Sequence, residues 1–248
     1  MIVMQSGKTG VNSSANSLII PNHIGFILDG NRRWAEKHNI PRWMGHMKGG
    51  VPKTEDVLDW CLELGVPQVS MFVLSTENLD RPKKEVESIL DAVYKGLEIL
   101  EKKQSLLDKY EVHVKFVGEL NRLPPKMLKI IGKIMQKTAK YQKKVLNVMI
   151  AYGSQFELTE TFKKIAEKVL KTGAITITPK DIGQNLLVPT PVDLVIRTGG
   201  MNRLSGFMMW QAAYAEIYVT KTLWPDFTKQ ELIKAIKWFG KAQRNYGK

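Results

Sequence analysis

The chain has 248 residues, and its contents of 44% hydrophobic and 25% charged residues are ordinary globular values that exclude a disordered, collagenous or disulfide-scaffold protein. Its single cysteine, Cys61, excludes an internal disulfide or a thiolate metal cluster, and its apolar runs are far shorter than the roughly 20 residues of a membrane helix, so a soluble, cytoplasmic protein is expected. The 37 lysines and arginines exceed the 24 acidic residues and give a net charge of +13, which favours an anionic partner. Because no nucleic-acid-binding signature accompanies this charge, phosphorylated metabolites and acidic lipid headgroups are favoured over nucleic acid.

The chain is predicted to consist of a leader and one domain. Residues 1–20 are rich in Ser, Asn and Gly, and their short apolar clusters cannot form the core of a signal peptide, so a flexible N-terminal leader is expected. Residues 21–248 contain no repeat, low-complexity stretch or composition shift that would mark a linker. We therefore expect a single domain over 21–248.

From residue 21 onward, short apolar runs alternate with longer amphipathic segments. Strands are predicted at 24–28, 69–74, 112–117, 146–151 and 194–197, with a sixth at 216–220. Helices are predicted at about 45–64, 83–108, 123–142, 155–171 and 228–243. Most of the strands are nearly continuous in apolar residues, as in sheets covered by helices on both faces, whereas 112–117 alternates and is expected nearer an edge. The pattern predicts an α/β fold with a mostly parallel central sheet flanked by helices.

Ligands of such sheets bind at the carboxyl ends of the strands, so the residues after each strand form the candidate site. The first strand runs into Asp29-Gly30-Asn31-Arg32-Arg33-Trp34. Asp29 offers a carboxylate to a hard cation, and Gly30 and Asn31 open a helix whose free N–H groups can hold a phosphate. The arginines add charge-assisted donors. A simple N-cap with solvated arginines remains an alternative.

The next two segments repeat this chemistry. Arg42 and Gly45-His46 precede a helix, where the histidine can donate to a phosphate or be incidental. The second strand ends in Ser75-Thr76-Glu77-Asn78, followed by Arg81. A plain capping box, with Thr76 or Asn78 as the cap, is the alternative interpretation of this loop.

The fifth strand runs into Arg197-Thr198-Gly199-Gly200, and Arg203-Leu204-Ser205 follows. The arginines around a glycine pair predict a second anion site, although an ordinary turn remains an alternative. Glu216 lies among apolar residues and must either pair with a cation or face an interface. Taken together, the motifs predict two phosphate sites and one or two cation-binding carboxylates at one sheet edge, as in an enzyme that handles two phosphorylated substrates with a divalent metal. No Walker loop or G-x-G-x-x-G is present, which disfavours kinases and dehydrogenases.

These motifs also resemble a known family. The run His23-Ile24-Gly25-Phe26-Ile27-Leu28-Asp29-Gly30-Asn31-Arg32-Arg33-Trp34-Ala35 resembles the signature of the cis-prenyltransferases, the undecaprenyl and dehydrodolichyl diphosphate synthases. The later blocks follow in order at 45–46, 75–82, 193–200 and 210–227. The resemblance implies a homodimeric, mostly parallel α/β enzyme that condenses isopentenyl diphosphate with an allylic prenyl diphosphate in the presence of Mg²⁺ to make polyprenyl diphosphates with Z double bonds.

The resemblance also assigns site residues. The metal site falls on Asp29 and on Glu216, which reaches it across the dimer, and the catalytic residues are Asp29 and Asn78, the latter helping to remove the proton. The allylic diphosphate site falls on Gly30, Asn31, Arg32, Arg33, Trp34, Arg42, His46, Ser75, Thr76, Glu77 and Arg81. The isopentenyl diphosphate site falls on Arg197, Arg203, Leu204 and Ser205. The tail Arg244-Asn245-Tyr246-Gly247 resembles the segment that helps to form the partner's site.

A growing hydrocarbon needs an apolar tunnel. Its expected lining comes from the helices beside the sheet, through Val51, Val57, Leu58, Ile89, Leu90, Val93 and Leu97. Long polyprenyl products are insoluble, so a transient contact of the cationic surface with anionic headgroups is expected, which would place the enzyme peripherally at the membrane. The trans-type synthases carry paired aspartates on a helical fold, and this chain contains no Asp-Asp pair.

Three positions depart from the family pattern. Leu79 replaces a tryptophan, Met201 replaces a glutamate and Gly206 replaces an asparagine. Two hypotheses follow: the enzyme still elongates with isopentenyl diphosphate, or the altered pocket admits another acceptor, such as a second allylic diphosphate or a hydroxyl, to give a branched or ether product. A third hypothesis, a non-catalytic partner subunit, is disfavoured because the 29–34 motif is whole.

Overall fold

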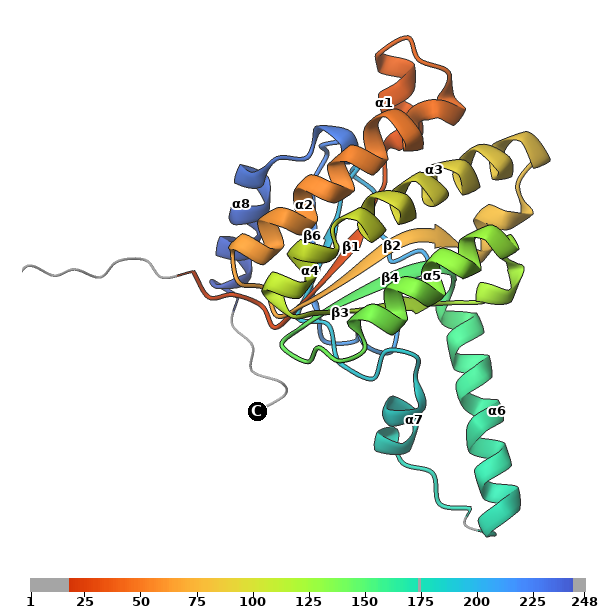
Figure 1. Cartoon of the computed structure of the whole chain (residues 1–248). Coiled ribbons are helices and arrows are strands. Elements are labelled where there is room, and N and C mark those ends of the chain that lie inside the picture. The colour runs from red at the N-terminus through yellow and green to blue at the C-terminus, as the bar shows by residue number, and fades with distance from the viewer. Residues whose placement is uncertain (1–17, 174, 243–248) are drawn as a thin grey trace, which may run out of the picture.

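The computed structural model describes residues 18–173 and 175–242, and its centre is one six-stranded sheet (Figure 1). The strands are β1 His23–Ile27, β2 Gln68–Ser75, β3 Val112–Val117, β4 Lys144–Tyr152, β5 Leu194–Arg197 and β6 Glu216–Val219. Their spatial order is β3-β4-β2-β1-β5-β6, and every neighbouring pair is parallel. The predicted parallel α/β sheet and its sixth strand are confirmed, and β3 lies at an edge as its alternating pattern predicts.

The helices connect these strands. They are α1 Asn31–Lys37, α2 Val51–Glu63, α3 Lys83–Lys102, α4 Gln104–Tyr110, α5 Pro125–Thr138, α6 Ser154–Thr172, α7 Pro179–Asn185 and α8 Lys229–Phe239. The continuous helix predicted at 83–108 is wrong, because the backbone leaves the helical conformation at Lys103, with φ −82° and ψ 18°, and separates α3 from α4. The short α7 was not predicted, although Thr178 caps it with a hydrogen bond from the backbone N–H of Asp181.

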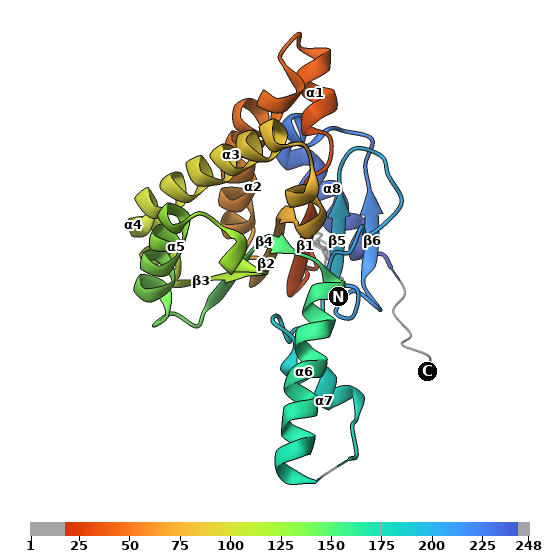
Figure 2. The same ribbon diagram turned by 90° about the vertical axis from the view of Figure 1, so that its right-hand side faces the viewer.

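The two faces of the sheet are covered differently. Helices α2, α3, α5 and α8 pack on one face, where Ile24, Phe26 and Met71 are buried with helix residues in the larger apolar core. On the other face, Phe207 and Met208 come from the long segment between β5 and β6, and they pack against strand residues in a second core. An irregular segment therefore buries much of the second face, and α6 and α7 project away from the sheet (Figures 1 and 2).

The N-terminal leader and the membrane-spanning character of the helices were the other expectations about the chain's organisation. The leader predicted at 1–20 falls largely outside the described residues, which begin at 18. Among the described residues, no helix combines the length and the apolar character that spanning a membrane requires.

Candidate active site

The carboxyl ends of the parallel strands carry the predicted site residues. Asp29 follows β1, Ser75 ends β2 and Arg197 ends β5, so the three side chains come from strands that lie next to one another. The turn after β1 requires glycine, because Gly30 has a φ of +114° and a Cβ placed there would lie 2.9 Å from the Leu223 backbone. This turn leads into α1 and leaves the Asp29 side chain partly exposed.

Asp29 is the centre of an ion-pair cluster. Its Oδ1 lies 3.0 Å from Nη2 of Arg33, and its Oδ2 lies 2.8 Å from Nη2 of Arg197. Arg197 is only 4% exposed, and it also donates to Ser205 Oγ at 2.9 Å and to the Arg203 carbonyl. The structure thus brings the predicted metal-binding carboxylate together with three residues of the predicted isopentenyl diphosphate site, Arg197, Ser205 and, through its backbone carbonyl, Arg203.

Backbone groups hold this cluster in place. The Asp29 carbonyl accepts hydrogen bonds from Thr198 Oγ1 at 2.7 Å and from the Trp224 N–H at 3.0 Å. The Gly199 carbonyl accepts from Nη1 of Arg33 at 2.8 Å. Gly199 has a φ of +81°, and a Cβ there would overlap the Arg33 guanidinium, so glycine is needed both for the turn and for the arginine.

A second cationic cluster lies between the start of α1 and the start of α3. Arg32 and Arg81 both bind Oε1 of Glu85, at 2.8 and 3.0 Å. Burial, together with the positive charges of Arg81 and Arg32, lowers the pKa of His46 to about 4, so the imidazole is neutral at physiological pH. Three residues of the predicted allylic diphosphate site are therefore neighbours. Glu85 was not predicted, although its spacing from Arg81 is the i,i+4 spacing of a helical ion pair.

The loop after β2 forms the predicted capping box. The Asn78 N–H donates to Ser75 Oγ at 3.2 Å, and the Ser75 N–H donates to Asn78 Oδ1 at 3.3 Å. The cap is Ser75 rather than Thr76 or Asn78, because Ser75 has the extended backbone of a cap. The Asn78 amide NH₂ has no hydrogen bond to any described part of the chain and is available to a ligand. Thr76 and Glu77 lie beside Gly153 at the end of β4.

Other predicted residues are engaged elsewhere. Arg42 pairs with Glu36 at 2.6 Å on the surface, and Trp34 Nε1 donates to Asp226 at 2.8 Å. Asn31 is buried and donates to the Leu28 carbonyl at 3.0 Å, and its Oδ1 has no hydrogen-bond partner in the described structure.

The segment after β5 contributes unevenly to the site. Arg203 reaches the Asp29 cluster through its backbone carbonyl, while the residue itself is exposed. Leu204 packs against the second apolar core and makes no polar side-chain contribution. Met201, which stands where the family pattern has a glutamate, is 37% exposed.

Glu216 does not share the edge that holds Asp29. It begins β6 and is opposite Leu194 at the start of β5, whereas Arg197 at the end of β5 is opposite Val219. The expectation that both carboxylates share one sheet edge is wrong within a single chain, because the parallel register puts Glu216 at the amino end of its strand. The tail 244–247 lies outside the described residues.

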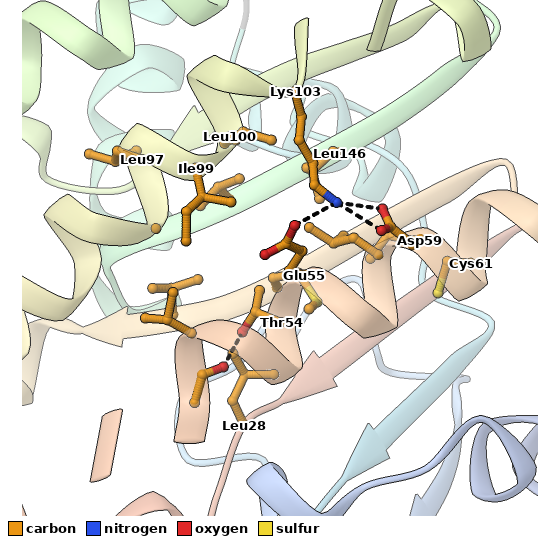
Figure 3. Close-up of a pocket in the computed structure, with 18 of the residues that line it drawn as sticks. Leu28, Thr54, Glu55, Asp59, Cys61, Leu97, Ile99, Leu100, Lys103 and Leu146 are labelled. Atoms are coloured by element: carbon orange, nitrogen blue, oxygen red, sulfur yellow. Dashed lines mark hydrogen bonds and ion pairs between the residues drawn. The ribbon is translucent and has the colours of Figure 1, made fainter. Parts of the chain in front are cut away.

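An apolar cavity opens beside the clusters, between α2, α3 and the sheet. Its volume is about 160 Å³, and Asn31 and His46 are among its lining residues. Figure 3 shows others, among them Leu28, Leu97 and Leu146. Of the seven expected tunnel residues, Val51, Leu58, Ile89, Val93 and Leu97 line it. Val57 and Leu90 do not line it and pack in the core instead. A hydrocarbon attached to a group held at His46 would enter this cavity directly.

The described residues contain no group of three or more His, Cys, Asp or Glu side chains that could hold a metal by themselves. Asp29 nevertheless fits Mg²⁺, because this ion is usually bound by one or two carboxylates with water and substrate phosphates completing its octahedron. The neighbouring Arg33 and Arg197 are the donors that such phosphates need.

Comparison with known proteins decides the family. Residues 27–247 match the family model described as putative undecaprenyl diphosphate synthase. The chain belongs to this family of cis-prenyltransferases. It is 38% identical over 237 residues to the tritrans,polycis-undecaprenyl-diphosphate synthase (geranylgeranyl-diphosphate specific) of Methanopyrus kandleri, and the match covers 92% of this chain and 85% of the relative.

Solved structures share the fold of this prenyltransferase. Lavandulyl diphosphate synthase from Lavandula x intermedia, in complex with dimethylallyl diphosphate, has a TM-score of 0.85 and 27% identity, covering 94% of this chain and 100% of the other. A probable undecaprenyl diphosphate synthase from Campylobacter jejuni has a TM-score of 0.76 and 32% identity, covering 92% and 99%. The predicted fold and the predicted transfer of prenyl groups are confirmed.

Proposed function

We propose that the enzyme is a Z-prenyl diphosphate synthase that condenses isopentenyl diphosphate with an allylic prenyl diphosphate to make a polyprenyl diphosphate. The observation that carries this proposal is the position of two cationic clusters next to one apolar cavity, whose lining includes Leu28, Asn31 and His46. Two clusters suit two diphosphates, and the cavity suits the hydrocarbon of one of them. The name of the relative from Methanopyrus kandleri makes geranylgeranyl diphosphate the first allylic substrate to test.

The cavity supports the assignment of the two substrates. His46 lines the cavity and lies with Arg32 and Arg81, so the diphosphate held there is the one that carries the chain into the cavity. Arg197 and Ser205 belong to the Asp29 cluster and are outside the cavity lining, which suits the short isopentenyl diphosphate. The sites that resemblance assigns to the two substrates agree with this arrangement.

The reaction requires stabilisation of charge more than proton transfer. Loss of the allylic diphosphate leaves a delocalised cation and a pyrophosphate, so preorganised cations and an oriented second substrate lower the barrier. Arg32 and Arg81 are held by Glu85, and Arg197 is buried against Asp29, so these donors lose little freedom when a diphosphate binds. The free amide of Asn78 can then orient a diphosphate near the carbon that loses its proton.

Mg²⁺ is the proposed cofactor. Asp29 would hold it together with substrate phosphates, and the bound ion would neutralise the departing pyrophosphate. In the structure Arg33 and Arg197 occupy the two carboxylate oxygens of Asp29. A diphosphate that draws these arginines toward itself leaves Asp29 available to the ion.

A homodimer is the proposed assembly, with Glu216 reaching the partner's metal site. Glu216 begins the edge strand β6, whose outer side pairs with no described strand, and the neighbouring Ile217 is 44% exposed. The formal charge of +13 supports a peripheral contact with anionic headgroups. Residues 21–248 are proposed to act as one catalytic domain.

A second candidate function concerns the acceptor. Met201 is exposed in the segment that leads to Ser205, and it leaves this pocket without the carboxylate of the family pattern. A structural neighbour of this chain, lavandulyl diphosphate synthase, was solved in complex with dimethylallyl diphosphate. An acceptor other than isopentenyl diphosphate, such as a second allylic diphosphate, therefore stands as the alternative.

Parallel assays separate these functions. The purified chain is incubated with Mg²⁺ and geranylgeranyl diphosphate, and isopentenyl diphosphate, dimethylallyl diphosphate or a prenol is supplied as the acceptor in separate reactions. Turnover with isopentenyl diphosphate alone supports the synthase and excludes the non-catalytic subunit. Turnover only with another acceptor would overturn it in favour of the second candidate.

A further inference from the structure

The segment between β5 and β6 has a left-handed backbone where it joins the Asp29 cluster. The φ angles are 51° at Ser205, 76° at Gly206 and 41° at Met208. Such a backbone is unfavourable for a residue that has a Cβ, and it persists only where surrounding contacts hold it. Because Ser205 accepts a hydrogen bond from Arg197, the contacts that hold this strained stretch also hold a residue of the site.

Gly206 is needed here for its backbone conformation and not for lack of space. The nearest atom that a Cβ on Gly206 would meet is the Ser154 nitrogen, at 4.0 Å. Glycine adopts the left-handed conformation freely, and asparagine is one of the few residues with a side chain that also adopts it routinely. The replacement of the family's asparagine by Gly206 therefore preserves the left-handed backbone at this position.

Ser154, the first residue of α6, binds this stretch at two points. Its N–H donates to the Gly206 carbonyl at 2.8 Å, and its hydroxyl donates to the same carbonyl at 2.7 Å. The hydroxyl also accepts from the Met209 N–H at 2.9 Å. Ser154 is only 1% exposed, so water does not readily replace these hydrogen bonds. One buried serine thus holds the strained backbone at both ends.

The next turn of α6 holds the same segment two residues farther on. Glu157 is 1% exposed, and its two carboxylate oxygens each accept from Nε2 of Gln211 at 3.1 Å. The Tyr152 hydroxyl at the end of β4 donates to Glu157 at 2.5 Å. A buried carboxylate is unfavourable unless hydrogen bonds satisfy it, so these donors fix Glu157 and the segment together. The β4–α6 junction therefore supports the segment at 206, 209 and 211.

Apolar packing does not by itself determine the direction of this backbone. Phe207 and Met208 are fully buried in the second core, and a Cβ on Gly25 would lie 2.6 Å from the Phe207 ring. Hydrophobic contacts have no preferred direction, whereas hydrogen bonds require particular angles. The hydrogen bonds of Ser154 flank these two apolar residues and fix the orientation in which the chain presents Ser205.

The orientation of Ser205 matters because Arg197 is buried and cannot follow it. Nη1 of Arg197 donates to Ser205 Oγ at 2.9 Å and also to the Arg203 carbonyl. Arg197 is 4% exposed, whereas Ser205 is exposed and can meet a ligand. A relaxed segment would move the Ser205 hydroxyl and the Arg203 carbonyl away from the arginine, and the pocket would lose its preorganised donors.

We propose that Ser154 is a positioning residue for the diphosphate that binds at Arg197 and Ser205, because it holds the 205–209 backbone in the conformation that binds this diphosphate. This inference rests on the proposed function and deepens it, since it identifies what orders the isopentenyl diphosphate pocket. Ser154 touches neither substrate and acts through Gly206 and Met209.

The test removes the hydroxyl and compares the two substrates. If Ser154→Ala lets the segment relax in about nine molecules of ten, the KM for isopentenyl diphosphate rises about tenfold. The kcat at saturating isopentenyl diphosphate and the KM for geranylgeranyl diphosphate are expected to stay those of the unaltered enzyme, because a bound diphosphate restores the segment and the allylic site lies outside it. A merely structural loss would reduce the amount of active enzyme and lower kcat without this division between the two KM values.

Thr161→Val is the matched control. Thr161 is another buried hydroxyl of α6, 1% exposed, and it donates to the Asn185 carbonyl at 3.3 Å instead of to the 205–209 stretch. If Ser154→Ala does not fold, Gly206→Ala disturbs the same backbone from the other side and is expected to raise the same KM, and Gly206→Asn is expected to raise it less. Equal KM values for isopentenyl diphosphate in folded Ser154→Ala and Thr161→Val would overturn the proposal.

Two measurements that need no turnover separate this proposal from the proposed function. Calorimetric titration with isopentenyl diphosphate is expected to show a dissociation constant about tenfold higher in Ser154→Ala than in Thr161→Val. If the unaltered enzyme binds isopentenyl diphosphate without condensing it, the proposed function fails and this difference still supports the role of Ser154. If the unaltered enzyme does not bind it, amide hydrogen exchange over 203–211 decides: faster exchange in Ser154→Ala than in Thr161→Val supports the role, and equal exchange refutes it.

Discussion

Gly96 offers a substitution whose effects on stability and on product length should be opposite. It lies within α3 and lines the cavity, and a Cβ placed on it meets nothing within 4 Å. Gly96→Leu gains about 0.8 kcal/mol because glycine is a poor residue in a helix interior. Full burial of the leucine side chain in the cavity would add about 1.5 to 3 kcal/mol to the free energy of unfolding, and packing strain would lower it by about 1 to 3 kcal/mol. The middle of these ranges is a net rise of about 1 kcal/mol in the free energy of unfolding.

The same side chain would occupy space that the hydrocarbon needs, so a shorter main product is expected. Gly132 provides the matched control, because it is an exposed glycine of α5 whose Cβ also meets nothing within 4 Å and which does not line the cavity. Gly132→Leu should gain only the stability that comes from the higher helix propensity of leucine, which would raise the midpoint of thermal unfolding by about 2 to 3 °C. It should leave the products unchanged. Thermal unfolding and mass spectrometry of the products measure both effects. A folded Gly96→Leu enzyme with unaltered product length would refute the assignment of this cavity to the hydrocarbon.

Three further predictions concern protonation and the site turn. Burial and neighbouring arginines hold the pKa of His46 at about 4, so a bound diphosphate should raise this pKa and binding at about pH 5 should take up protons. Calorimetry in buffers of different ionisation enthalpy should show this proton uptake for the unaltered enzyme and not for His46→Gln. Equal binding heats in all buffers would argue against it. Burial lowers the pKa of His23 from 6.5 to about 4, so folding favours the neutral ring. This contribution to the free energy of unfolding is fully present above pH 6.5 and should fall by about 3 kcal/mol as the pH drops to 4. Urea unfolding of His23→Gln should show a weaker dependence of stability on pH, and the same dependence in the variant would contradict the assignment. Gly199→Ala forces an alanine to a φ of +81° and places its Cβ against the Arg33 guanidinium. We therefore expect the free energy of unfolding to fall by about 1 to 2 kcal/mol and the KM for a diphosphate substrate to rise. Steady-state kinetics that match those of the unaltered enzyme would be inconsistent with this packing.

The sheet and the strand-end motifs could be predicted from local sequence because each depends on neighbouring residues. The apolar run before Asp29 defines β1, and the parallel arrangement then carries Asp29 and Arg197 to one edge. The pairing of Asp29 with both Arg33 and Arg197 depends on rotamers and on a contact across 168 residues, which no local pattern specifies.

The features that sequence reasoning missed depend on tertiary contacts. The break of the predicted 83–108 helix occurs at Lys103, whose partners Glu55 and Asp59 lie on another helix, so the helical periodicity carries no sign of it. The location of Glu216 at the amino end of β6 follows from the strand register, which the apolar pattern does not determine in an edge strand.

Incubation of the purified chain with Mg²⁺, isopentenyl diphosphate and geranylgeranyl diphosphate, with Asp29→Ala assayed in parallel and the products identified by mass spectrometry, tests directly whether this enzyme is a Z-prenyl diphosphate synthase. We expect a ladder of products that increase by one isoprene unit with the unaltered enzyme and no ladder with Asp29→Ala, because Asp29 would hold the metal and positions Arg33 and Arg197. A ladder of undiminished yield from Asp29→Ala, or no condensation with isopentenyl diphosphate by the unaltered enzyme, would contradict it.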